Sequence, residues 1–549
     1  MPNSREAPVT KKITIEKPTH GGRRTPRGHM IISFSNSAIE FKSLGEQRMA
    51  RSRVAALPSR FASRSVNLLI FIFVGFFWFA GQANAQAPTT PPYGPGAQTP
   101  TAANPNLSQV EIEAIGWLQG FLRINTTNPP GNELVAAKYL ADILQKNGIQ
   151  SEIFESTPGR GILVARMASS AVSNPSRALL LLGHLDVVGV DKSKWTVDPF
   201  GAVLKDGYIY GRGAIDDKSM TIANLAVFIA IKRSGLRLTR DIIFLAEGDE
   251  EAGGENGMKF AVEKHWDKIA AGYSLNEGGH VELKDGKVPY VAIAASEKVP
   301  VSVDIIATGT SGHASLPRKD NAVVHLSAAI AKIGTYEAPV QFNTVSHAYF
   351  EGLAKVEDPE TAKWMESLNS PDRGEHAARY LSNTNPLWNA MLRDTISPTM
   401  LQAGIRVNVI PPEARGAMNI RLLPGNQLEP LLGKLRALVN DPEIRLEVEP
   451  GEVETAPSSS VDSELFGSIT RVTGQVFPGA TAFPMMDTFA TDSARLRLRN
   501  VQAYGLLPFP LTIEDEWRMH GEDERIPVTS FQKGIDFLFA IVNDFSVTK

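Results

Sequence analysis

The sequence contains no cysteine among its 549 residues. Disulfide bonds, thiolate zinc sites and a cysteine nucleophile are therefore excluded. A metal ion can be bound only by His, Asp and Glu side chains, which are typical of catalytic rather than structural zinc sites. A large excess of one charge is also missing, because 56 basic and 59 acidic residues leave a formal net charge of -3. We therefore expect no nucleic-acid partner.

Long apolar runs are scarce, and the most prominent one covers residues 66–80. Its length of about 15 residues is short for a membrane span but suits the apolar core of a signal peptide. A basic stretch precedes it, and the small-residue cleavage pattern Ala-Asn-Ala follows at 83–85. We expect residues 1–85 to be an N-terminal extension and signal peptide, so that the protein is exported, periplasmic or secreted. The alternative is an uncleaved anchor that tethers the chain to a membrane through residues 66–80.

The rest of the chain divides into a linker and two domains. Residues 86–106 are rich in Pro, Thr, Gly and Ala, which predicts a flexible linker. Strands alternate with helices over 107–299, which indicates a mostly parallel α/β sheet. Residues 300–423 read as a smaller α+β domain inserted into the larger one, and 424–549 complete the larger domain.

Hydrophobic periodicity predicts the main elements of both domains. Helices are expected at 133–146, 219–234, 321–333, 428–439 and 463–473. Strands are expected at 161–166, 178–182, 241–246, 445–448 and 501–506. The stretch 340–400 is polar and irregularly helical.

Acidic and histidine residues follow several apolar strands of the larger domain. In open α/β sheets, ligands bind outside the carboxyl ends of the strands, so these side chains are expected to meet in one crevice. The residues concerned are His184 and Asp186 in GHLD, Asp216 in GRGAIDDK, Glu250 and Glu251 in GDEEAGG, Glu277 in NEGG, and His520.

The short patterns have a chemical meaning that none of them proves alone. In His-x-Asp, His184 can bind a metal through one ring nitrogen while Asp186 accepts a hydrogen bond from the other. In Glu-Glu, one carboxylate can bind metal while its neighbour takes a proton as general base. Each pattern also has an ordinary structural interpretation, namely a strand-end His beside a solvated Asp, or two acids that face water.

Taken together, the patterns HLD, GRGAIDDK, GDEEAGG, NEGG and a late His resemble a known family. It is the dinuclear-zinc metallopeptidase family of aminoacylase, glutamate carboxypeptidase and succinyl-diaminopimelate desuccinylase, and the resemblance spans residues 107–549. The stretch 340–400 is most similar to the carboxypeptidase S and N-acyl-amino-acid hydrolase branch. The resemblance implies an α/β, mostly parallel-sheet zinc-peptidase catalytic domain, with residues 300–423 as an inserted α+β lid or dimerisation domain.

The resemblance also implies a role for each site residue. One zinc would take His184 and Glu277, the other would take Glu251 and His520, and Asp216 would bridge them. Glu250 would be the general base, and Asp186 would orient His184. Two Zn²⁺ ions per subunit are expected, and Co²⁺ or Mn²⁺ also suit these ligands.

The inserted domain carries residues that resemble the family's substrate-binding groups. His313, in TSGHAS, resembles a histidine that stabilises the oxyanion and that dimeric members supply from the neighbouring subunit. A homodimer is expected if it acts in this way. Asn408 and Arg421 resemble the pair that holds the substrate carboxylate, for which a guanidinium is well suited. Asn419 stands where many relatives have Asp, and Ala494 displaces Arg495 from another family signature.

These features predict a metal-dependent hydrolase of the carboxypeptidase or dipeptidase type. Its substrates would be small peptides with a free carboxylate, cleaved by a zinc-activated water. The alternative within the same chemistry is an N-acyl-amino-acid amidohydrolase. A more distant alternative is a non-catalytic protein that binds metal or substrate, which would have no need of the base Glu250.

Overall fold

The computed structural model describes residues 105–548, except 171–173 and 451–454. The expected signal peptide at 1–85 and nearly all of the expected linker at 86–106 lie outside the described residues. Among the helices that are described, none combines the length and apolar character needed to cross a membrane.

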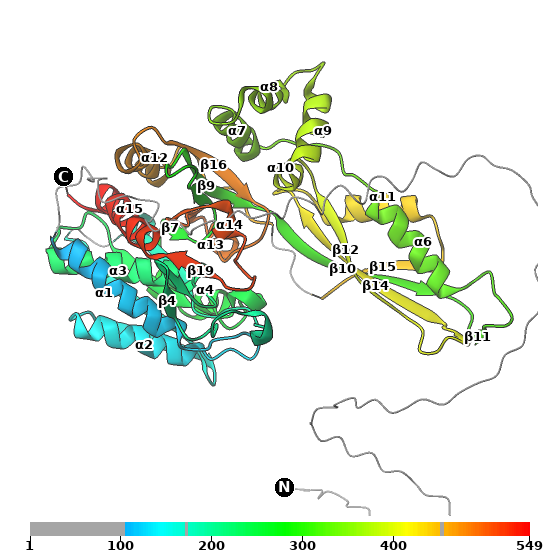
Figure 1. The fold of residues 1–549 in the computed structure, drawn as a ribbon, viewed down its shortest axis with the longest axis horizontal. Helices are drawn as coiled ribbons and strands as arrows, with labels where there is room; N and C mark the ends of the chain where they lie inside the picture. The colour runs from blue at the N-terminus through cyan, green and yellow to red at the C-terminus, as the bar shows by residue number, and fades with distance from the viewer. Residues whose placement is uncertain (1–104, 171–173, 451–454, 549) are drawn as a thin grey trace, which may run out of the picture. The chain divides into compact units, whose positions relative to one another are not determined.

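A ten-stranded mixed sheet forms the centre of the larger domain (Figure 1). Its strands run in the order β1-β2-β6-β3-β7-β17-β9-β8-β18, and β16 also pairs with β9. The central neighbours β6, β3, β7 and β17 are parallel, as expected for an α/β domain. The strands are β1 (Ser151–Thr157), β2 (Arg160–Met167), β3 (Leu179–His184), β6 (Ile242–Glu247), β7 (Tyr273–Asn276), β8 (His280–Glu282), β9 (Tyr290–Glu297), β16 (Thr481–Asp487), β17 (Gln502–Gly505) and β18 (Pro510–Leu511).

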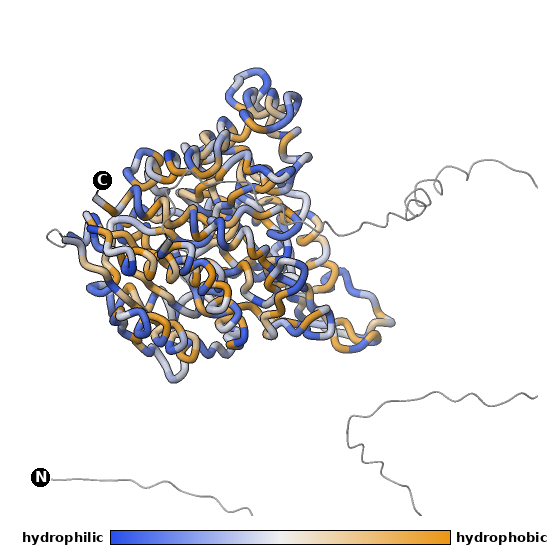
Figure 2. The backbone as a smooth tube through the Cα atoms, turned by 60° about the vertical axis from the view of Figure 1, so that its left-hand side comes forward, coloured by the Kyte–Doolittle hydropathy of each residue, from blue (hydrophilic) through white to orange (hydrophobic). Residues whose placement is uncertain are grey.

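The central strands are apolar without interruption because both faces of the sheet are covered. In β3, Leu179 and Leu181 belong to one hydrophobic cluster, whereas Leu180 and Leu182 belong to another. This alternation places successive side chains on opposite faces of the sheet. Figure 2 shows how apolar and polar segments follow one another along the chain.

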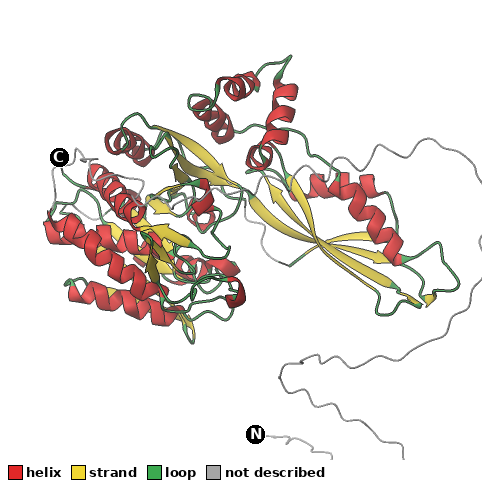
Figure 3. Cartoon of the chain, in the orientation of Figure 1, coloured by secondary structure: helices red, strands yellow, loops and turns green. Residues whose placement is uncertain are grey.

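Helices cover the two faces of this sheet (Figure 3). One cluster contains side chains of α1 (Pro105–Leu122), α2 (Glu133–Lys146), α3 (Lys218–Ser234), α12 (Glu464–Val476) and α15 (Val528–Ser546). The other contains side chains of α4 (Met258–Lys264), α5 (Trp266–Ile269) and α13 (Ser493–Arg497). The expected helix at 133–146 is confirmed, and the one expected at 219–234 begins one residue earlier.

The smaller domain is a four-stranded antiparallel sheet in the order β12-β14-β10-β15. It contains β10 (Val299–Thr308), β12 (Thr395–Ala403), β14 (Glu413–Leu422) and β15 (Ile444–Val448). Two helices, α6 (Ala322–Gly334) and α11 (Leu428–Val439), pack side by side against it (Figure 1). Every second residue of β10, beginning at Val299, enters the separate core of this domain.

The expected start of the inserted domain at 300 agrees with β10, but its expected end at 423 and the assignment of the residues in between are wrong. First, β15 pairs with β10 and α11 contributes to the core of the smaller domain, so this domain continues to Val448. Second, the helices at 344–392 pack on the core of the larger domain. Sequence order alone could not assign these segments, because a strand finds its sheet through long-range pairing. The four helices are α7 (Thr344–Leu353), α8 (Pro359–Ser367), α9 (Gly374–Thr384) and α10 (Pro386–Leu392).

Candidate metal centre

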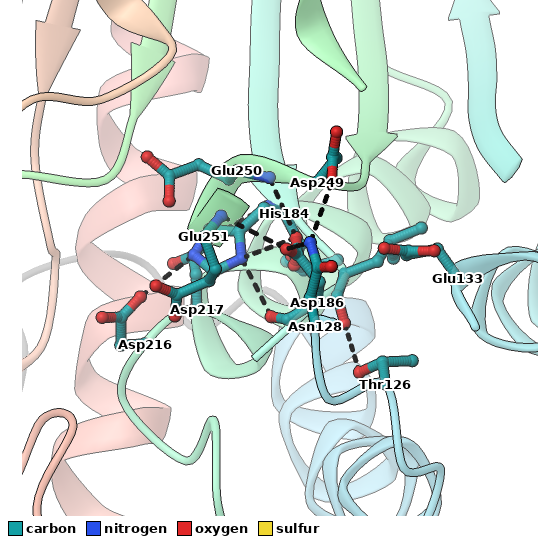
Figure 4. Close-up of polar contacts among 12 residues, drawn as sticks. Thr126, Asn128, Glu133, His184, Asp186, Asp216, Asp217, Asp249, Glu250 and Glu251 are labelled. Atoms are coloured by element: carbon teal, nitrogen blue, oxygen red, sulfur yellow. Dashed lines mark hydrogen bonds and ion pairs between the residues drawn. The ribbon is translucent and has the colours of Figure 1, made fainter. Parts of the chain in front are cut away.

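Three neighbouring parallel strands deliver acidic and histidine side chains to one edge of the large sheet (Figure 4). His184 is the last residue of β3, and Glu277 directly follows β7. Glu250 and Glu251 follow β6 after a turn at Asp249, whose φ of 70° lies in the left-handed region. Parallel strands end at the same edge, so the expected crevice is present.

Two loops complete the cluster. Asp216 lies just before α3, and its Oδ1 is 3.0 Å from Nε2 of His184. His520 lies in the loop after α14 (Ile513–Glu516), where Nε2 is 3.1 Å from Oδ2 of Asp216 and 3.2 Å from Oε1 of Glu251. Asp216 therefore contacts both histidines through different oxygens, which is the arrangement required of a bridging carboxylate.

The ligand atoms form two overlapping groups, each within 4.8 Å. One group is His184, Asp216 and Glu251, and the other is His184, Glu250 and Glu277. Nitrogen and carboxylate ligands in groups of three fit a catalytic zinc-type ion with an open position. All five expected metal ligands are thus brought together, and the expected base Glu250 lies among them.

The charges of the cluster also fit a cation. Burial raises the pKa of Glu277 and Glu250 well above the usual range, and nearby carboxylates add to this rise. Although burial acts in the opposite direction, hydrogen bonds from His184 and His520 hold the pKa of Asp216 below its usual value. Hydrogen bonds to Asp216 and Glu251 raise the pKa of His520 to about 10. A site this rich in buried carboxylates is stabilised by positive charge, which a divalent ion would supply.

Asp186 holds the centre together differently from the expectation. Nδ1 of His184 lies 3.0 Å from the backbone oxygen of Asp186 and 3.6 Å from its carboxylate, so the backbone carbonyl is the hydrogen-bond partner. The buried carboxylate instead accepts hydrogen bonds from the backbone N–H of Glu250 and of Glu251, each at 3.2 Å. Asn128 Nδ2 donates a further bond at 2.8 Å. Asp186 thus orients His184 and anchors the Glu-Glu turn as well.

A cavity of about 1160 Å³ opens over the cluster. Asp216, Glu250, Glu251, Glu277 and His520 line it, together with Arg421 from β14 of the smaller domain and Arg495 from α13.

Two expected substrate-binding residues are not brought into this cavity. His313 lies in β11 (Gly312–His313), is exposed, and contacts Ser315 through Nδ1. Asn408 is also exposed and lies beside it, where its backbone oxygen accepts a hydrogen bond from Ala314. Within one chain, these two residues are therefore separate from the metal cluster.

Sequence reasoning missed several residues that support the cluster. Asp249 accepts hydrogen bonds from Asn128 at 2.9 Å and from Arg160 at 2.6 Å, and Glu133 pairs with the same arginine. Glu524, four residues after His520, is fully buried beneath the Asp216 loop. Each of these residues acts through a contact between distant segments, which the sequence alone does not show. Only their nearness to a recognisable motif could have drawn attention to them.

The fold and donor set are those of a metal-dependent α/β hydrolase. A family model described as Peptidase family M20/M25/M40 matches residues 180–544, which is more than half of the chain. The chain therefore belongs to this family of metallopeptidases and amidohydrolases.

Several known proteins are similar to the chain. A probable carboxypeptidase S-like protein of Dictyostelium discoideum is 28% identical over 67% of this chain and 72% of its own length. Human N-fatty-acyl-amino acid synthase/hydrolase PM20D1 is 29% identical over 68% of this chain and 75% of its own length. Among solved structures, an M20 family metallo-carboxypeptidase from Sulfolobus solfataricus has a TM-score of 0.61 at 20% identity, covering 79% of this chain and 99% of that one. At that identity the structural likeness supports the fold alone.

Proposed function

We propose that the protein is a carboxypeptidase or dipeptidase that hydrolyses amide bonds in small peptides with a free carboxylate. The observation that carries this proposal is Arg421, which lines the same cavity as the metal cluster. Its Nε donates a hydrogen bond to Oδ1 of Asn419 at 2.9 Å, which fixes the plane of the guanidinium. A planar, always charged group in the same cavity suits the carboxylate of a substrate whose amide bond lies at the metal cluster.

Two divalent ions, which we propose to be Zn²⁺, would be held by His184, Asp216, Glu251, Glu277 and His520. When bound, they would polarise the scissile carbonyl and lower the pKa of water in the site. Glu250 takes the proton from the attacking water at its carboxylate and returns it to the leaving amine nitrogen. Arg421 holds the carboxylate of the leaving residue, which keeps the amide aligned with Glu250.

The second candidate function is hydrolysis of N-acyl amino acids. Apolar side chains also line the cavity, namely Phe489, Leu507 and Met519, and they would suit an acyl group. The name of the human relative refers to N-fatty-acyl-amino acids, which supports this candidate. Both functions use the same metal chemistry and the same carboxylate clamp, so they differ only in the group on the acyl side.

We further propose that His313 and Asn408 reach the cavity of a second copy, which would make the active form a homodimer. Their exposure at the end of the smaller domain supports this arrangement, because exposed residues are free to meet a partner. Export remains a proposal that depends on residues 1–85, with a membrane tether at 66–80 as the alternative. The N-terminal residue of the mature protein tests it, because cleavage after Ala85 would leave Gln86 first.

The test is hydrolysis by the purified full-length chain, loaded with zinc, on matched dipeptides and N-acyl amino acids. Each substrate is offered with a free and with an amidated C-terminus. We expect turnover that requires the free carboxylate, and the panel separates peptidase from acylase. Glu250→Gln is the control, and it should keep both metals but lose roughly 10²–10⁴-fold in turnover. Metal-loaded protein that turns over no substrate would favour a binding protein and overturn the proposal.

A further inference from the structure

Glu524 is a fully buried carboxylate whose two oxygens accept four hydrogen bonds. Oε2 accepts from Nη1 of Arg212 at 2.7 Å and from the backbone N–H of Gly213 at 2.9 Å. Oε1 accepts from the backbone N–H of Ile215 at 2.7 Å and of Asp216 at 3.1 Å. Each oxygen therefore accepts two hydrogen bonds, and all four donors lie in residues 212–216. This stretch ends at Asp216, which contacts both histidines of the cluster.

The same network also fixes the loop of His520. Nη2 of Arg212 donates to the backbone oxygen of Gly521 at 2.9 Å, directly beside His520. The backbone of Glu524 adds a second tie, because its oxygen accepts from the N–H of Gly211 at 3.0 Å. Glu524 and Arg212 thus join the loop that carries Asp216 to the loop that carries His520.

The side chain of His520 is held in place less by burial than that of His184. The ring is 53% exposed, and the residue has a φ of 60°, in the left-handed region that a residue other than glycine seldom adopts. His184, in contrast, is 2% exposed at the end of a central strand. On the His520 side, where packing against the sheet does not fix the ligand, contacts between loops must contribute more to its position.

We propose that Glu524 is a positioning residue that sets the separation between Asp216 and His520, and thereby the affinity of the metal ion they share. It does not touch substrate or metal, and it acts through the backbone of one ligand and the loop of the other. Supporting contacts of this kind typically change metal affinity about 10–100-fold. The inference rests on the proposed two-metal site.

The test is calorimetric titration of metal-free full-length protein with Zn²⁺, together with the visible absorption of Co²⁺ bound to the same variants. In Glu524→Gln, an amide N–H₂ faces backbone N–H donors, so the clamp is broken with little change in volume. We expect the binding step of the ion that His520 would hold to weaken by about tenfold or more, and the other step to weaken less, because only the first ion depends on both tied loops. The Co²⁺ spectrum should lose the contribution of one ion.

Asp523→Asn is the matched control. Asp523 precedes Glu524 and ties the same loop to Thr196, through the N–H at 2.8 Å and Oγ1 at 2.9 Å, without touching the Asp216 loop. It should bind both metals as the wild type does. Glu524→Asp, which keeps the charge but shortens the reach, provides a second variant if Glu524→Gln fails to fold, and should show the same selective loss.

Two results would overturn the inference. If the Glu524 variants bind both metals with wild-type affinity while only their melting temperature falls, Glu524 is a stabilising residue alone. If both binding steps weaken equally, it does not act on one ion. Failure of the wild type to bind any divalent ion would instead overturn the proposed function, and this inference with it.

Discussion

The two histidines of the centre lie in opposite structural settings. His184 ends a strand that pairs with parallel strands on both sides, and its side chain is 2% exposed. His520 lies in a loop, its side chain is 53% exposed, and its polar contacts are with Asp216 and Glu251. One side of the metal centre is therefore built by the sheet, whereas the other side depends on loop contacts. Ligands on regular elements are positioned more precisely than ligands on loops.

This difference also explains where the supporting contacts lie. On the His184 side, the buried Asp186 gathers three donors and fixes the turn that carries Glu250. On the His520 side, Glu524 must reach into a neighbouring loop to achieve the same result. We therefore expect the second side to be the more easily disturbed by substitution.

Replacing each histidine by alanine should reveal the difference between the two sides most strongly. His184→Ala removes the ligand common to both groups, so turnover should fall on the order of 10⁴-fold or more, with both metals lost. It also leaves buried partners unsatisfied and should destabilise the metal-free protein by about 2 kcal/mol or more. His520→Ala should lose one metal and roughly 10²-fold in turnover. Its metal-free form should lose only about 0.5 kcal/mol in the free energy of unfolding. Metal titration, turnover and thermal unfolding of both variants check this. Equal losses of metal and of stability in the two variants would show that the contrast in burial has no functional consequence.

The exposed end of the smaller domain carries His313, which lies outside the cavity of its own chain. If His313 serves the site of a second copy, chains with His313→Ala and chains with Glu250→Gln should be nearly inactive alone. Co-expressed, they should regain up to about a quarter of wild-type turnover, because half of randomly formed dimers would be mixed and each would hold one complete site. Turnover of the co-purified mixture measures this. Recovery no greater than the sum of the two separate variants would place His313 in its own chain or remove it from catalysis.

Ligands at strand ends could be predicted from the sequence more readily than ligands in loops. His184, Glu250 and Glu277 lie at or shortly after the ends of apolar strands, so their convergence could be predicted from the rule that parallel strands end at one edge. His520 follows the expected strand at 501–506 only at a distance, so its role as a ligand came from family resemblance, since nothing in a loop sequence fixes where its side chain lies. Glu524 was missed for the same reason. In the fold, most strands and helices could be predicted from periodicity, but the limit at 423 was wrong because β15 pairs with β10 across a long stretch of chain.

The smallest expected effect is a pH dependence confined to the loop-borne histidine. In the metal-free protein, hydrogen bonds to Asp216 and Glu251 raise the pKa of His520 from 6.5 to about 10. A raised pKa in the folded state means that protonated His520 stabilises the fold fully below pH 6.5, and that this contribution is lost as the pH rises through about 10. Because the ring is half exposed, solvent screening limits the effect to on the order of 1 °C in melting temperature.

The measurement is the difference in melting temperature between wild type and His520→Gln across this pH range, with a chelator present. The difference should shrink toward high pH in the metal-free protein. Its dependence on pH should disappear when zinc replaces the chelator, because a metal-bound histidine no longer exchanges a proton in this range. A difference that grows with pH would mean that the neutral ring is the form that the loop holds, and the ion-pair description of the exposed side would be wrong.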